Sequence, residues 1–494
     1  MSTVRPPSPR SMPSPAPNGS HSGSAGLALA GPSVPRPADA EGFRSFIATG
    51  WGSPERPVRT APGTGVAAML HRERLSEHFP GRPLLISAGS APLRSGDCFY
   101  EFRPDSAFVW LTGCQTENAV LVMSPSGTGH DSVLYIPEPF GPGDRGFFED
   151  TEHGELWAGP VPGLAEWEAA LQITVRPLSR LGEAVDAVVP ALRAGHHEAP
   201  AALRGMERSA ELDRVLAELR LVKDAWEIGQ LREAVNATVE GFAQVIREVP
   251  RSLTAGGERW LQGTFDRAAR TLGNGPGYAT IVGCGGHAPT LHWSKADGAV
   301  TADELLLLDM GVELRSLYTA DVTRTFPVSG TFSPEQRRVY ELVEKAHRAA
   351  LAAVGPGKRF SDFYTASLEV IAQGLHDWDL LPVSVDEALS PGGQQHRRWI
   401  VCGVGHHLGL DVHDCAGASY AAYQAGTLEP GNVLAVEPGL YFHSHDLTVP
   451  DELRGIGIRI EDNVLVTGAG HEVLSDALPS TADGIERWMA AVLG

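Results

Sequence analysis

The chain of 494 residues is poor in cysteine and lacks any long uncharged apolar run. Its five cysteines are odd in number and none forms a Cys-x-x-Cys pair, which argues against a disulfide framework or a cysteine zinc site and favours a reducing compartment. No run reaches the ~18 apolar residues of a membrane span, and the apolar stretch 25–31 is too short for the core of an export signal. We therefore expect a cytoplasmic protein with no membrane partner.

Basic charge is also scarce. The sequence has 40 Lys and Arg against 60 Asp and Glu, a formal net charge of −20, and no basic block interrupts the acidic excess. A protein that holds a nucleic-acid backbone is therefore excluded as the expected class. Hydrophobic residues make up 42% and charged residues 20%, which is enough apolar material for sizeable cores, and the length predicts two or three domains.

The composition changes twice along the chain. Residues 1–40 are rich in Pro, Ser and Gly and show no periodicity, which predicts a disordered tail. Residues 41–208 alternate short apolar runs with turn signals and helical patterns, which predicts an α/β domain. Residues 209–494 open with two amphipathic helices within 211–249 and continue as a larger mixed domain. The expected fold class is α/β in the broad sense, with an α+β second domain.

Two aspartates stand at the ends of apolar strands. Asp309 follows the run Leu305–Leu308, and Asp321 follows a predicted hairpin turn. An antiparallel hairpin can bring two such residues side by side, so two carboxylates can meet at one point. The alternative is that Asp309 merely ends its strand and Asp321 pairs with Arg324.

A glycine-rich segment carries three histidines within eight positions: His406, His407 and His413. Glycines let a backbone approach closely, so this density favours a site, although structural histidines remain an alternative. Further along, Arg459 and Glu461 share one face of an apolar strand, and a surface ion pair is the simpler account of them.

The combination is more informative than any single residue. Five potential ligands lie on strongly apolar strands, where a cluster of buried charge is costly unless cations neutralise it. Four carboxylates and one imidazole suit Mn²⁺, Co²⁺ or Fe²⁺ and tolerate Zn²⁺, and paired divalent ions recur in hydrolases. The five residues are Asp309, Asp321, His406, Glu437 and Glu461.

At this point the sequence resembles a known family. Five segments, in this order, are similar to the aminopeptidase P and prolidase branch of the "pita-bread" metallopeptidases: 309–311, 318–326, 405–414, 436–441 and 454–462. Residues 102–113 also resemble the N-terminal domain of aminopeptidase P, so the likeness covers roughly 60–490. It implies a small N-terminal α/β domain followed by a C-terminal pita-bread (creatinase/aminopeptidase) domain.

The resemblance also implies residue roles. The five residues above become ligands of two divalent metal ions, most commonly Mn²⁺. His292 becomes a substrate-binding and catalytic histidine, and His413 steadies the tetrahedral intermediate. Arg459 orients the ligand shell, and Tyr441 lines the pocket. A proline ring needs a small apolar pocket closed by aromatic side chains, for which Trp110 is a further candidate.

These roles make chemical sense. A water held between two cations has its pKa lowered toward ~7, so hydroxide is available at neutral pH. Glu437 can accept its proton and pass it to the leaving nitrogen, which in an Xaa-Pro bond is a tertiary amide without a hydrogen of its own. His292 and His413 can stabilise the developing oxyanion.

Two departures from the family pattern stand out. Cys402 occupies the place, four residues before His406, where the family usually has a histidine, and a thiol is a weak hydrogen-bond donor. Eleven residues separate Asp309 from Asp321, where ten are more common. The extra residue is harmless if the hairpin turn absorbs it, and would turn Asp321 away if it fell within the strand.

We therefore expect a metal-dependent Xaa-Pro aminopeptidase that acts on peptides with proline at the second position. The alternatives are a prolidase-like dipeptidase, a homologue with altered or lost peptidase activity because of Cys402, and a creatinase-like enzyme that works without metal. Relatives are often dimers or tetramers, so a homo-oligomer is expected by analogy.

Overall fold

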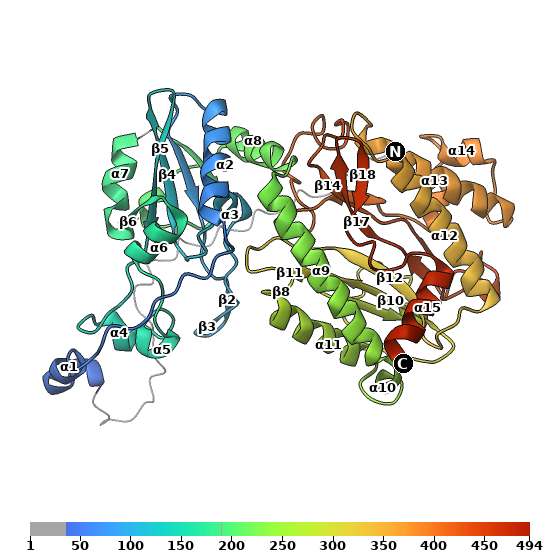
Figure 1. Cartoon of the computed structure of the whole chain (residues 1–494), viewed down its shortest axis with the longest axis horizontal. Helices are drawn as coiled ribbons and strands as arrows, with labels where there is room; N and C mark the ends of the chain where they lie inside the picture. The colour runs from blue at the N-terminus through green and yellow to red at the C-terminus, as the bar shows by residue number, and fades with distance from the viewer. Residues whose placement is uncertain (1–35, 189) are drawn as a thin grey trace, which may run out of the picture. The chain divides into compact units, whose positions relative to one another are not determined.

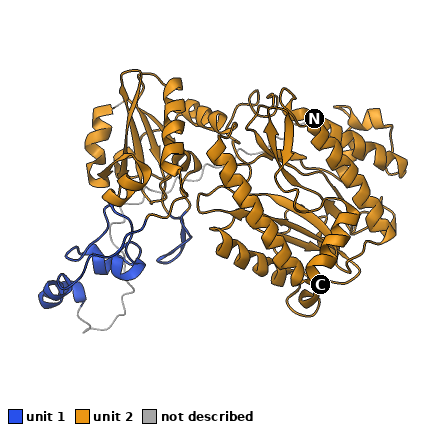
Figure 2. Cartoon of the chain, in the orientation of Figure 1, with its two compact units in different colours: residues 1–57, 91–102, 138–163 blue, residues 58–90, 103–137, 164–494 orange. Residues whose placement is uncertain are grey.

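The computed structural model describes residues 36–188 and 190–494, so most of the predicted tail lies outside the described residues. The chain divides into two compact units, drawn in different colours in Figure 2. The smaller unit takes in residues up to 57, 91–102 and 138–163, and the larger one takes in the rest. No helix of the described part combines the length and apolar character that a membrane crossing requires.

The smaller unit has little regular structure. Aromatic contacts hold it together, such as that between Phe43 and Phe148, whose ring centroids are 5.2 Å apart. Arg56 forms an ion pair with Glu155. Its elements are α1 (Glu41–Ile47), β2 (Leu93–Ser95), β3 (Cys98–Phe99), α4 (Gly146–Glu149) and α5 (Glu155–Ala158).

The N-terminal part of the larger unit is built on a five-stranded mixed sheet in the order β6-β5-β4-β1-β7. Apolar residues of the central strands, such as Leu85 and Val122, pack against Leu181 and Val185 of a helix, which gives the α/β core that the sequence predicts. The strands are β1 (Leu84–Ser87), β4 (Val120–Ser126), β5 (Gly129–Ile136), β6 (Thr174–Pro177) and β7 (Leu192–Gly195), and the helices are α2 (Thr64–His78), α3 (Ser106–Thr112), α6 (Leu164–Leu171) and α7 (Leu181–Val188).

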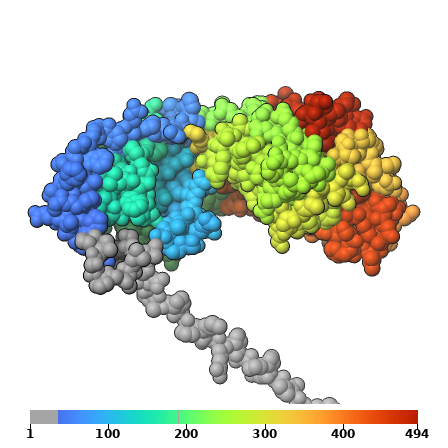
Figure 3. Space-filling model, turned by 90° about the horizontal axis from the view of Figure 1, so that it is seen from below, coloured from blue at the N-terminus to red at the C-terminus, as the bar shows by residue number. Residues whose placement is uncertain are grey.

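Two capped helices open the C-terminal part. Ser209 caps α8 (Ala210–Arg220), and Asp224 forms a capping box with Glu227 at the start of α9 (Ala225–Arg247). These are the two helices expected within 211–249. The long helix α9 runs beside α11 (Gly257–Leu272), as Figure 1 shows, and α11 forms part of the yellow-green surface in Figure 3.

Small antiparallel sheets follow, and the helices α12 (Pro334–Ala353) and α13 (Phe360–Asp377) pack on each other beside them. One sheet contains β9, β10 and β12, and another contains β13, β14, β17 and β18. Two further sheets have two strands each: β8 pairs with β11, and β15 pairs with β16. The strands are β8 (Gly275–Pro276), β9 (Ile281–Cys284), β10 (Leu305–Met310), β11 (Val312–Glu313), β12 (Val322–Pro327), β13 (Gly405–His407), β14 (Val433–Val436), β15 (Gly439–Tyr441), β16 (Gly457–Arg459), β17 (Asp462–Thr467) and β18 (Gly470–Val473), and the remaining helices are α10 (Val249–Ser252), α14 (Val385–Leu389) and α15 (Ala482–Leu493).

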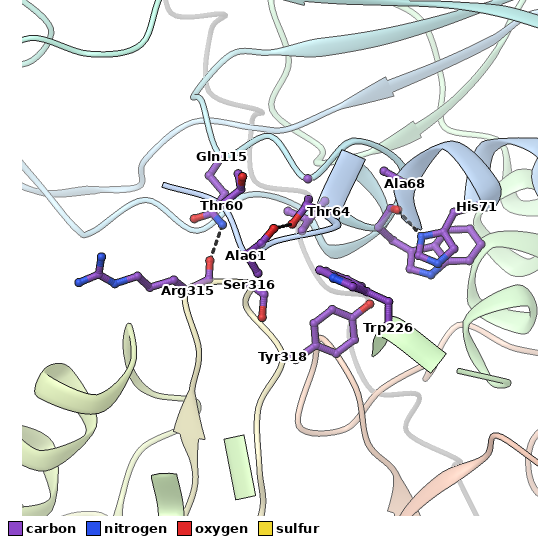
Figure 4. A pocket seen from close by; sticks show the side chains of 13 residues that line it. Thr60, Ala61, Thr64, Ala68, His71, Gln115, Trp226, Arg315, Ser316 and Tyr318 are labelled. Atoms are coloured by element: carbon purple, nitrogen blue, oxygen red, sulfur yellow. Dashed lines mark hydrogen bonds between the residues drawn. The ribbon is translucent and has the colours of Figure 1, made fainter. Parts of the chain in front are cut away.

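His71 of α2 connects α3 to the start of helix α9. Its Nδ1 lies 2.7 Å from the carbonyl oxygen of Trp110, and its Nε2 lies 2.9 Å from Oδ2 of Asp224. Both ring nitrogens therefore face acceptors, so a protonated imidazole ring donates on both sides. Burial lowers the pKa of His71, but Asp224 and Glu227 outweigh it and raise the pKa to about 9. Figure 4 shows the small pocket beside this ring, which Trp226 and Tyr318 also line.

We predict that this ion pair makes stability depend on pH. Because the folded-state pKa of His71 lies above its ordinary value of 6.5, its contribution is complete below pH 6.5 and is lost as pH rises through 9. The shift corresponds to roughly 3 kcal/mol. In urea unfolding between pH 6.5 and 9.5, His71→Gln should remove most of this decline. His78→Gln, on the same helix but exposed, serves as the control, and an equal decline in all three proteins would contradict the prediction.

Candidate metal centre

The five predicted ligands lie in or beside five different strands. Asp309 lies in β10 and Asp321 directly precedes β12, where the two strands pair in register with Asp309 opposite Thr323. His406 lies in β13, opposite Ala435 of β14. Two glutamates complete the group: Glu437 directly follows β14, and Glu461 follows β16. The β10–β12 ladder runs without a register shift, so the hairpin turn absorbs the extra residue between the aspartates.

The ligand atoms lie within reach of common cations. His406 Nε2 is 3.3 Å from Oδ2 of Asp321 and 3.4 Å from Oε1 of Glu437. Ligand atoms of Asp321, His406 and Glu461 all lie within 4.8 Å of one another. All five residues line one cavity of about 1170 Å³. The structure thus brings together the whole predicted ligand set.

Like charge and burial dominate the electrostatics of this cavity. Burial, together with the neighbouring carboxylates, raises the pKa of Glu437 to about 7 and raises the pKa of Glu461 well above its usual value. Burial also raises the pKa of Asp309, against the opposing effect of Arg459. For His406 the balance is reversed, because Asp321 and Glu437 outweigh burial and raise its pKa to about 9. The cluster therefore favours positive charge between its members.

The donor set fits divalent metal ions. Nδ1 of His406 donates to the carbonyl oxygen of His407 at 3.1 Å, so Nε2 is the nitrogen that faces the carboxylates and that would bind a metal ion after losing its proton. Oε2 of Glu461 accepts a hydrogen bond from Thr323 at 2.7 Å, whereas its buried Oε1 has no hydrogen-bond partner among the described residues. An unpartnered buried carboxylate oxygen is costly without a cation.

Groups outside the ligand set hold it in place. Arg459 donates to Oδ2 of Asp309 at 2.5 Å, and the hydroxyl of Tyr278 donates to Oδ1 of the same carboxylate at 2.6 Å. The side chain of Asn463 accepts from the backbone N–H of Asp321 at 3.1 Å. We did not anticipate Tyr278 or Asn463, because neither stands in a pattern that carries a signal by itself.

The two simpler alternatives from the sequence are wrong. Arg324 pairs with Asp462 at 2.6 Å and not with Asp321. Arg459 is 3% exposed and pairs with Asp309, so it is no surface partner of Glu461. Both arginines are buried among carboxylates, which is why adjacency in the sequence misassigned their partners.

The cavity walls carry His292, His413 and Cys402. The ring of His413 meets that of His406 edge-on, with centroids 4.4 Å apart. Aromatic side chains that the sequence analysis did not single out form much of the remaining wall. They are Phe360, Tyr364, Tyr420 and Tyr423.

Two predicted pocket residues do not line this cavity. Trp110 is buried in α3 and lines the small pocket beside His71, on which it stacks, and its indole donates to Glu227 at 3.2 Å. Tyr441 is buried behind Arg459, whose guanidinium donates to the tyrosine hydroxyl at 3.2 Å. These positions correct the expectation that both residues form the wall. An aromatic residue near a motif carries no signal about which side of the backbone it faces.

Comparisons with known proteins agree with this geometry. Residues 229–468 match metallopeptidase family M24, and residues 69–194 match the aminopeptidase P N-terminal domain. Xaa-Pro aminopeptidase 2 of Streptomyces coelicolor is 46% identical over 467 residues, covering 91% of this chain and 96% of the relative. Aminopeptidase P of Escherichia coli with the inhibitor Pro-Leu aligns with a TM-score of 0.76 at 29% identity over 87% of this chain and 98% of its own. Aminopeptidase PepP of Pseudomonas aeruginosa aligns with a TM-score of 0.74 at 28% identity, over 89% of this chain and 99% of its own.

We predict that divalent cations stabilise the chain through this cluster. In a thermal melt of metal-stripped protein, added Mn²⁺ should raise the midpoint, because an ion at 1,000 times its Kd contributes about 4 kcal/mol to the folded state. Glu461→Gln should lose most of the shift, since it removes a charged ligand. The exposed Glu369→Gln controls for the loss of one negative charge and should keep the full shift. Equal shifts in both variants would contradict a site at this cluster.

Proposed function

Because the chain belongs to metallopeptidase family M24, we propose that it is a metal-dependent Xaa-Pro aminopeptidase that releases an N-terminal residue preceding proline. The observation that carries the proposal is the convergence of four carboxylates and one histidine on one cavity. The similarity to Xaa-Pro aminopeptidases along nearly the whole chain supports the bond specificity.

The ligands we propose for two divalent ions are Asp309, Asp321, His406, Glu437 and Glu461. Hard oxygen donors with a single imidazole favour Mn²⁺ as the metal used. When bound, such ions would polarise the substrate carbonyl and lower the pKa of water, so that hydroxide is available to attack the carbonyl carbon at neutral pH. Arg459 keeps Asp309 oriented toward the cluster.

Glu437 is the proposed proton carrier. Its carboxylate lines the cavity 3.4 Å from Nε2 of His406, where it can take a proton from the attacking water and return it. The leaving prolyl nitrogen needs that proton to depart as an amine, because the amide nitrogen of an Xaa-Pro bond has no hydrogen. His413 and His292 on the cavity wall are the proposed hydrogen-bond donors to the substrate carbonyl and its developing oxyanion.

The aromatic wall is the proposed contact surface for the prolyl ring. Phe360 and Tyr423 lie 5.3 Å apart by ring centroid and both line the cavity. A flat apolar surface suits a compact ring without polar hydrogens. At about 1170 Å³ the cavity is larger than an ordinary small-molecule pocket, which suits a peptide that continues past proline.

Three further expectations stay proposals. We place the border between the N-terminal and catalytic domains at 208/209, where Ser209 caps α8. We propose a homo-oligomer, a dimer or tetramer, with peptides and neither nucleic acid nor membranes as partners. Exposed apolar side chains of the smaller unit, such as Phe46 and Trp157, support self-association. A cytoplasmic location, based on the cysteine pattern, also stays a prediction.

A second candidate is a family member with altered peptidase activity, favoured by Cys402 alone. Its thiol lines the cavity, and burial raises its pKa, so it stays neutral beside Glu437. A neutral thiol is a weaker hydrogen-bond donor to substrate than a histidine. The complete ligand set argues for retained catalysis.

The function is tested with a panel of three peptides. Ala-Pro-Ala should lose its first residue in the presence of Mn²⁺, Ala-Ala-Ala should be a poor substrate, and a chelator should abolish turnover. Release of alanine from Ala-Pro only would identify the dipeptidase alternative. Bound metal without turnover of any peptide would support the second candidate and reject the proposal.

We predict that Cys402→His raises kcat on Ala-Pro-Ala. An added hydrogen-bond donor at the cavity wall should contribute about 1.4 kcal/mol to the transition state, or roughly tenfold. Cys402→Ser, which is close to the thiol in size, controls for polarity alone. If histidine leaves kcat unchanged, the cysteine does not limit the rate.

A further inference from the structure

The loop between His406 and His413 has no regular secondary structure past His407, yet it presents a histidine to the cavity. Backbone hydrogen bonds close it on itself, because Asp414 N–H donates to the carbonyl of His407 at 2.9 Å. At Gly409 a Cβ atom would collide with the carboxylate of Asp414, so only glycine lets the loop fold this tightly. The remaining constraints come from outside the loop.

Asp411, two residues before His413, is held by side chains from two other regions. The hydroxyl of Ser106, in α3 of the N-terminal domain, donates to its Oδ1 at 2.6 Å. Arg220, at the end of α8, donates to its Oδ2 at 2.9 Å. Both carboxylate oxygens thus have partners, which fixes the side chain and, through it, the backbone of the loop.

Arg103 contacts the same loop and also the segment that follows the proposed ligand Asp309. Its Nη2 donates to the carbonyl of Leu410 at 2.5 Å, and its Nε donates to Oε2 of Glu313 at 2.9 Å. Glu313 lies in β11, four residues after Asp309. One guanidinium of the N-terminal domain therefore joins the segment after a metal ligand to the segment before His413.

The other end of the loop is anchored just as firmly. Asp414, directly after His413, is 1% exposed and its carboxylate pairs with Arg220 and with Lys223 Nζ, the latter at 3.1 Å. Lys223 comes from the segment between α8 and α9. Removing one partner of such a buried pair threatens folding, so the half-exposed side of the network is the better place to test its role.

We propose that Ser106 and Arg103 of the N-terminal domain are positioning residues for the peptidase reaction, acting through Asp411 on His413. Neither residue lines the catalytic cavity. A hydrogen-bond donor to an oxyanion must sit within about 0.5 Å of its productive position, and an irregular loop does not achieve that alone. The inference rests on the proposed function for its kinetic part only.

Ser106→Ala is the test, because it removes the hydroxyl that donates to Asp411 and accepts from Nη1 of Arg103. The contacts of Arg103 with Leu410 and Glu313, and that of Arg220 with Asp411, do not involve this hydroxyl. We expect kcat on Ala-Pro-Ala to fall about tenfold with KM within twofold, since the oxyanion contact forms in the transition state. Hydrogen exchange of residues 408–415 should become faster. Arg82→Gln, which breaks an exposed ion pair between the N-terminal domain and Glu211 of α8, should change neither quantity.

A double-mutant cycle distinguishes positioning from general loosening. In a His413→Ala background, Ser106→Ala should cause no further loss of kcat, because the residue it positions is gone. An equal fold loss in both backgrounds would overturn the proposal, as would unchanged hydrogen exchange at 408–415. Absence of any peptidase activity in the unmodified protein would reject the proposed function instead, and the exchange experiment would still decide whether Ser106 holds the loop.

Discussion

Mutual repulsion among four buried carboxylates is the constraint on which the rest of this structure depends. Without cations, burial and proximity raise the pKa of Asp309, Glu437 and Glu461. The protein nevertheless places them together, within or next to strands whose ladders run in register. The free energy cost of this arrangement is offset when cations bind between the carboxylates. The buried Oε1 of Glu461, which has no hydrogen-bond partner among the described residues, marks one place where a cation would be stabilising.

The surrounding polar groups hold the clustered carboxylates in a single geometry. Arg459 and Tyr278 occupy both oxygens of Asp309, while Thr323 occupies one oxygen of Glu461. These contacts leave the remaining lone pairs directed into the cavity. Preorganisation of this kind reduces the cost of reorganising the site when substrate and ions bind.

The convergence of the five clustered side chains, and an α/β region before a larger mixed region, could be predicted because each rests on a local pattern. These patterns are charged residues at the ends of apolar strands and a capped helix after a change in composition. The ion pairs could not be predicted, since Arg324 and Arg459 choose partners through packing across sheets. Trp110 shows the same limit, because its place depends on how α3 packs against α9. Long-range side-chain pairing leaves no periodic trace in a single sequence.

The guanidinium of Arg103 matters for any fragment of the chain that lacks the N-terminal region. It contacts both Glu313 and the carbonyl of Leu410, so the two segments meet through a side chain that neither of them supplies. A fragment that kept all five clustered side chains but lacked Arg103 would lose this shared contact. The surroundings of the cluster are therefore shaped by the N-terminal region as well as by the segments that carry the five clustered side chains.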